Sequence, residues 1–166
     1  MENDIKRHEG FKLSLTGFVA GFVATLTFHQ LAIWLLWGIG LAPFSPYNMT
    51  AVPPMGVPAV ISLAFWGGVW GIIFTGLYGW FPKGNSFWVT AFLFGAILPS
   101  LTALLVVLPL KGRPMGGGWH LNVLATMFIV NGIWGLTTGA LIRLYKKMLL
   151  WRSLLVTHCG PGMLCH

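Results

Sequence analysis

The chain has 166 residues, of which 56% are hydrophobic and only 8% are charged, whereas soluble proteins carry roughly 25% charged residues. Its three acidic residues all precede position 10, which excludes carboxylate-based catalysis and carboxylate metal sites inside the apolar part of the chain. The formal net charge of +7 comes from Lys and Arg residues beside the apolar runs. This placement indicates anionic lipid headgroups as partners and argues against nucleic acid.

Four apolar runs follow one another, and each reaches the length of about 20 residues that a membrane-spanning helix needs. We therefore predict an all-α fold, an integral membrane four-helix bundle. The first run is longer than the apolar core of a signal peptide, about 7 to 15 residues, so we expect it to be retained. The predicted domain covers residues 13–145, with spans at 13–41, 58–81, 87–110 and 121–145.

Lys and Arg residues are distributed unequally between the two sides of this bundle. The side with both termini and the loop between the second and third spans carries eight of them, and the other side carries only Lys111 and Arg113. Basic residues are enriched on the cytoplasmic side of membrane proteins. We therefore expect residues 1–12 and 146–166 to be cytoplasmic.

A proline-rich loop at residues 42–57 joins the first two spans. Because each proline fixes φ and lacks an N–H donor, we expect this loop to be stiff, extended and non-helical. We interpret it as a connector that leads into the second span at Pro58. The alternative is a lid that packs over the bundle.

Glycine pairs at four-residue spacing occur in three of the predicted spans. In lipid this spacing lets two helix backbones approach closely, where dispersion and weak polar contacts hold helices together. The candidate helix-packing residues are Gly17 and Gly21 in the first span, Gly67 and Gly71 in the second, and Gly135 and Gly139 in the fourth.

A few polar side chains interrupt the apolar runs at one depth. His29, Ser100 and Asn131 each lie about ten residues from the outer end of their span, which is about 15 Å at the helical rise, and Gln30 is next to His29. In the simpler interpretation they hydrogen-bond across helices and hold the bundle. In the alternative they line a small polar pocket, because ionisable groups inside membranes often serve function.

The two halves of the chain share short motifs in the same order, which suggests a duplicated two-helix unit with parallel repeats. A chain rich in Gly and Trp also produces such matches by chance. The matching segments are 16–21 with 90–95, 54–56 with 114–116, and 68–71 with 132–135.

The tail, residues 146–166, mixes apolar and basic residues before a Cys/His cluster. We expect its first part to lie along the cytoplasmic membrane surface. Four thiol and imidazole ligands could in principle hold zinc, but the Cys-x5-Cys spacing is not a usual zinc pair, so we predict no metal site. The weak candidates are His158, Cys159, Cys165 and His166.

Several segments resemble a group of small bacterial four-helix inner-membrane proteins over about residues 13–145. These segments are 27–30 in the first span, 43–49 and 53–58 in the first outer loop, and 62–68 in the second span. The resemblance implies a four-helix architecture and a location in a bacterial inner membrane. It brings no catalytic residue.

No phosphate-binding loop, dinucleotide fingerprint or catalytic triad is present in the sequence. We therefore expect a protein that is not an enzyme and needs no cofactor, and we interpret it as an accessory subunit that interacts with other membrane subunits or with itself. The alternative is a small transporter or permeation unit around His29 and Asn131. A third hypothesis takes His29 as an axial ligand of haem or another pigment, although no second histidine lies within a span.

Overall fold

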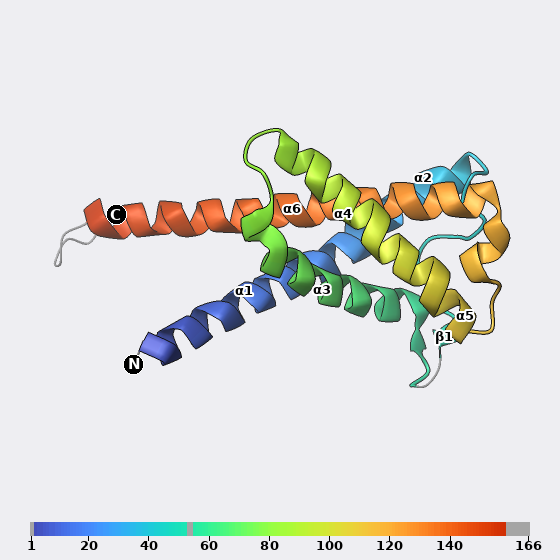
Figure 1. Cartoon of the computed structure of the whole chain (residues 1–166), viewed down its shortest axis with the longest axis horizontal. Helices are drawn as coiled ribbons and strands as arrows, with labels where there is room; N and C mark the ends of the chain where they lie inside the picture. Colours follow the sequence, from blue (N-terminus) through green and yellow to red (C-terminus); the bar gives the residue numbers. More distant parts are fainter. Residues whose placement is uncertain (1, 53–54, 159–166) are drawn as a thin grey trace.

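The computed structural model describes residues 2–52 and 55–158, with side chains at 10–52, 55–152 and 154. The described chain is a bundle of four long helical segments joined by short loops (Figure 1). All four are long and apolar enough to cross a membrane, so the prediction of an all-α membrane four-helix bundle is confirmed. By length and composition, the candidate membrane spans are Gly10–Gly38, Ala59–Trp80, Ser86–Leu110 and Leu121–Arg152.

The first helical segment consists of α1 (Glu2–Ala24), the π-helical turn η1 (Thr25–His29) and α2 (Gln30–Gly38). The Thr25 and Thr27 hydroxyls, at the start of and within the π turn, donate to carbonyls four residues earlier, each over 2.8 Å. Such back-bonding competes with the regular backbone ladder and bends helices. Two such bonds coincide with the π turn next to His29.

The loop after α2 contains a minimal antiparallel ladder of β1 (Ala51–Val52) and β2 (Val57–Pro58). Gly56, in the turn between the two strands, has φ +66°, a conformation that glycine adopts without steric cost. The loop leads directly from β2 into α3 (Ala59–Leu77), which is the role of a connector.

The second helical segment is α3 followed by the 3₁₀ turn η2 (Tyr78–Trp80). The third consists of α4 (Ser86–Thr102), the π turn η3 (Ala103–Val107) and α5 (Leu108–Leu110). In η3 the Leu108 N–H donates to the Ala103 carbonyl, five residues earlier. Pro109 follows immediately, and a proline ring displaces the carbonyl four residues before it. This displacement accounts for the widened turn.

A left-handed turn precedes the last helix. Gly116, Gly117, Gly118 and Trp119 all have positive φ, between +58° and +74°, within η4 (Met115–Trp119). Three consecutive glycines make this conformation accessible, since other residues rarely adopt it more than singly.

The last helix, α6 (Leu121–His158), has 38 residues and runs without a break past Tyr145. We expected residues 146–166 to form a separate interfacial tail, but residues 146–158 continue the helix in the same direction (Figure 1). No glycine or proline occurs between Gly139 and the end of α6, so nothing interrupts its hydrogen-bond ladder.

Close glycine contacts join the helices in pairs. A methyl group added at Gly21 would overlap the Gly67 carbonyl oxygen, and one added at Gly17 would overlap the Gly71 carbonyl oxygen, so α1 and α3 touch backbone to backbone. On the other side of the bundle, α4 and α6 meet where Gly135 faces Gly95, a residue not among the predicted packing glycines.

Gly139 differs from the other predicted packing glycines. A methyl group there would lie 3.1 Å from the Phe87 ring and 3.3 Å from the Phe74 ring, so this glycine makes room for aromatic side chains. Phe74, Phe87 and Trp134 are buried in the main apolar core, which all four helical segments share.

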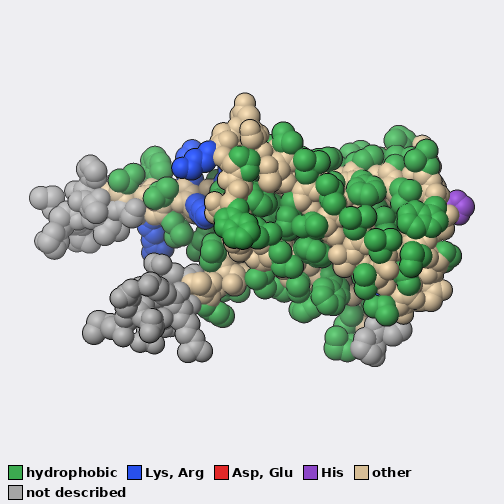
Figure 2. All heavy atoms as spheres, in the orientation of Figure 1, with side chains coloured by type: hydrophobic (Ala, Val, Ile, Leu, Met, Phe, Trp, Pro, Cys, Tyr) green, Lys and Arg blue, Asp and Glu red, His purple; other side chains and the backbone are tan. Residues whose placement is uncertain are grey.

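The surface of the bundle is mostly apolar on the face shown in Figure 2, and the visible Lys and Arg side chains gather toward the end that holds both chain termini. We call this the terminal end, and the opposite end, with β1, β2 and η4, the loop end. An apolar girdle is what contact with lipid tails requires.

We expect Gly21→Ala to destabilise the folded bundle by about 1 to 3 kcal/mol, because its methyl group overlaps a backbone carbonyl that cannot move independently of α3. The matched control is Gly76→Ala on α3, where a methyl group meets open space. Unfolding in detergent mixtures would measure both variants. An equal effect of the two would contradict the close helix contact.

Candidate functional site

The polar residues predicted to share one depth meet in the half of the bundle toward the loop end. Asn131 on α6 donates from Nδ2 to the Ser100 Oγ over 3.0 Å, and Ser100 on α4 donates in turn to the Met127 carbonyl over 3.0 Å. Ser100 is fully buried. These bonds tie α4 to α6 at a point where Pro99 already interrupts the α4 ladder.

His29 and Gln30 reach the same layer from the first helical segment. Both side chains are buried, and the Gln30 Nε2 lies 3.5 Å from the His29 Nδ1. The imidazole also lies close to the Asn131 side chain. The structure therefore brings all four candidate residues into one polar cluster, which we call the polar layer.

A fifth residue, Tyr47, connects the loop at residues 42–57 to this layer. Its backbone N–H donates to the Gln30 Oε1 over 2.8 Å, and its hydroxyl donates to the Leu26 carbonyl over 2.9 Å. Tyr47 has φ +48°, which is uncommon for a residue other than glycine. Sequence reasoning missed this contact, because a tyrosine after a proline carries no signal of its distant partner.

The hydrogen bonds of the polar layer form two links, one from the loop to the first helical segment and one between α6 and α4. In these links Gln30 accepts from Tyr47, and Ser100 accepts from Asn131 and donates to a carbonyl. Chemically the layer offers hydrogen-bond donors and acceptors and one imidazole, with no carboxylate. These groups are better suited to holding helices in position, binding polar ligands or relaying protons than to nucleophilic catalysis.

Two hollows of the structure lie elsewhere. One, of about 340 Å³, is lined by apolar residues of α1 and α6 such as Val19 and Leu141, and the other, of about 190 Å³, lies at the terminal end. Neither hollow is lined by a residue of the polar layer, that is by His29, Gln30, Ser100 or Asn131. Within the described part of the chain, no group of three or more metal-ligating side chains is present.

The weak metal candidates in the tail are not placed. Cys159, Cys165 and His166 lie outside the described residues, and only the backbone of His158 is described, at the end of α6.

A buried tryptophan joins the two helix pairs near the middle of their candidate membrane spans. The Trp134 Nε1 on α6 donates to the Gly21 carbonyl on α1 over 3.0 Å, and the Thr25 hydroxyl donates to the same carbonyl over 2.8 Å. Because a buried indole N–H needs a partner in lipid, this bond fixes where α6 crosses α1.

Comparison of the chain with protein-family models, with curated proteins and with solved structures gives no match.

A double-mutant cycle of Ser100→Ala and Asn131→Ala should give a coupling free energy of about 1 kcal/mol, since interhelical side-chain bonds in membranes average about 0.6 kcal/mol and reach about 1.7. Unfolding free energies of the four proteins measure it. The control pairs Ser100→Ala with Thr137→Ala, whose hydroxyl bonds only carbonyls of its own helix. That pair should be additive, and additivity of the first pair would refute the polar contact.

Proposed function

We propose that the protein is not an enzyme and serves as an accessory subunit that interacts with other membrane subunits or with itself. The observation that carries this proposal is that Gln30, Ser100 and Asn131 of the polar layer are already bonded within the protein: Gln30 accepts from the Tyr47 N–H, Asn131 donates to Ser100, and Ser100 donates to the Met127 carbonyl. A site that binds and releases a substrate would present polar groups without such partners.

The outer surface also supports an interaction role. Large aromatic side chains project from the first two helical segments, with Trp34, Trp37 and Trp66 each more than half exposed. Apolar surface in lipid gains nothing from burial alone, so helix association uses shape and close packing instead. Rigid rings of this kind provide shape for a neighbouring helix.

We further propose that the chain is a duplicated two-helix unit. Its support lies in contacts between matching positions. Gly21 faces Gly71 in the first half of the chain, and the residues that match them, Gly95 and Gly135, face each other in the second half. Likewise, a methyl group at Gly68 would meet the Phe18 ring, and one at Gly132 would meet the Phe92 ring. Matching residues making matching contacts is what duplication followed by divergence produces.

For location we propose a bacterial inner membrane with both termini in the cytoplasm. This rests on the resemblance to small bacterial membrane proteins and on the excess of Lys and Arg at the terminal end. The same cations would lie at the level of anionic lipid headgroups.

A second candidate function, a small permeation unit, is favoured by one observation. The π turn η1 ends at His29, and isolated π turns frequently mark functional sites. In this candidate the polar layer would open to water during function, with Asn131 and Ser100 exchanging their mutual bond for bonds to a solute.

Gentle purification from the native membrane, followed by mass spectrometry and an absorption spectrum, tests the accessory role. We expect partner subunits in stoichiometric amounts and no visible absorption band. A colourless homo-oligomer without partners would favour permeation. A band that disappears in His29→Ala would establish pigment binding instead.

Water access to the polar layer separates the two candidates directly. In a chain with Cys159→Ser and Cys165→Ser, we expect Ser100→Cys to react far more slowly with a water-soluble maleimide than Met49→Cys in the exposed outer loop. The reason is that the Ser100 side chain is fully buried among bonded groups. Equal rates would contradict a sealed interior.

A further inference from the structure

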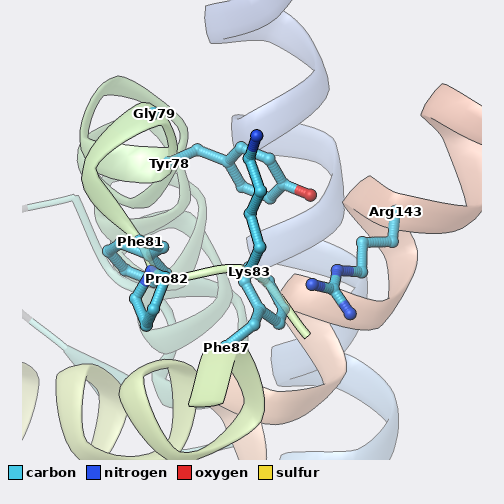
Figure 3. A pocket seen from close by; sticks show the side chains of 7 residues that line it. All are labelled: Tyr78, Gly79, Phe81, Pro82, Lys83, Phe87 and Arg143. Carbon is cyan, nitrogen blue, oxygen red and sulfur yellow. The ribbon is translucent and has the colours of Figure 1, made fainter. Parts of the chain in front are cut away.

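A small hollow with basic and aromatic walls lies at the terminal end, between η2, the loop at residues 81–85, the start of α4, and α6 (Figure 3). Its volume of about 190 Å³ admits a phosphate-sized group and excludes a whole nucleotide or lipid. The lining residues are Tyr78, Gly79, Phe81, Pro82, Lys83, Phe87 and Arg143.

Arg143 enters this hollow from α6 with its guanidinium already oriented. The guanidinium carbon lies 3.6 Å from the centroid of the buried Phe87 ring and 4.9 Å from that of Trp88. Stacking occupies the flat face of the guanidinium and leaves the N–H donors at its edge available. These donors form the planar fork that matches two oxygens of a phosphate.

Two lysines add positive charge near Arg143: Lys83 lines the hollow, and Lys146 lies against Tyr78, one of its lining residues. Lys83 comes from the loop, and Figure 3 shows its side chain extending past Tyr78. The Lys146 Nζ lies 3.7 Å from the centroid of the Tyr78 ring. All Asp and Glu residues of the chain lie within its first nine positions, so none of the described side chains supplies a carboxylate partner to these cations.

One wall of the hollow lies where the chain passes from the second candidate membrane span to the third. The second membrane-spanning segment ends at Trp80 and the third begins at Ser86, so the loop that contributes Lys83 lies where the chain leaves the membrane. Trp80 is 87% exposed and Trp88 also reaches the surface, as expected for aromatic residues at a membrane interface. Lipid phosphates lie at this level.

We propose that this hollow is a binding site for the phosphate of an anionic phospholipid, with Arg143 as the bidentate donor and Lys83 and Lys146 supplying charge. The glycerol and acyl chains would extend outward over the apolar side of the bundle. The proposal does not depend on the accessory role. A soluble phosphate ester shares the headgroup chemistry but lacks acyl chains to hold it at this depth.

Lipid retention by the purified full-length protein tests the site. The protein would be placed in nanodiscs containing phosphatidylglycerol and phosphatidylcholine, and bound lipid would be counted by native mass spectrometry after transfer to detergent. We expect Arg143→Gln to reduce retained phosphatidylglycerol about tenfold, because a charged bidentate contact is lost. Lys83→Gln is the second variant, since this loop lysine is exposed and its loss leaves the core intact.

Lys147→Gln is the matched control. It removes the same charge from the same end of α6, but Lys147 is exposed and does not line the hollow. Retention in this control should remain within about twofold of the unchanged protein, since an exposed, screened charge contributes little. Equal losses in all three variants would reveal a diffuse electrostatic attraction and overturn the site, as would wild-type protein that retains no phosphatidylglycerol.

Inorganic phosphate and glycerol 3-phosphate separate the two sources of a phosphate group. We expect neither to displace phosphatidylglycerol at millimolar concentration, because they lack the acyl chains. Displacement by either one, lost in Arg143→Gln, would assign the hollow to a soluble phosphate ester and overturn the lipid assignment.

Discussion

The close approach of two backbones at Gly21 constrains most of the bundle. There α1 contacts α3 without intervening side chains, and the same Gly21 carbonyl accepts bonds from Thr25 and from Trp134. In lipid, where burial of apolar surface gives no net drive, close contact and polar bonds must hold helices together. One glycine thus fixes the distance between the first two segments and the crossing point of α6.

The polar layer extends this arrangement toward the loop end. Ser100 and Asn131 join α4 to α6, and Gln30 joins the first segment to the loop at residues 42–57 through the Tyr47 N–H. Each of these hydrogen bonds offsets the free-energy cost of burying a polar group inside a membrane. The layer therefore stabilises a single arrangement of the helices, which agrees with an accessory role more readily than with repeated opening.

Much of the architecture could be predicted because it depends on one-dimensional patterns. Apolar runs indicate the spans. Counting residues inward from the span ends grouped His29, Ser100 and Asn131, and the structure brings these residues together. Their role as a binding site stays a prediction. Pairing was less accessible: Gly95 as the partner of Gly135 and Trp134 as the donor to Gly21 depend on which helices are neighbours. The π turns and the unbroken α6 depend on competition among local hydrogen bonds, which composition does not reveal.

The unbroken α6 has a mechanical consequence. At a rise of 1.5 Å per residue its 38 residues extend about 57 Å, more than the roughly 40–45 Å of a bilayer with its headgroups. Such a helix is longer than the thickness of the bilayer, and it has no glycine or proline after Gly139 at which it could bend. A force on the C-terminal end of α6 would therefore be transmitted along the continuous helix to Trp134 and Asn131. A partner bound to that end would act directly on the middle of the bundle.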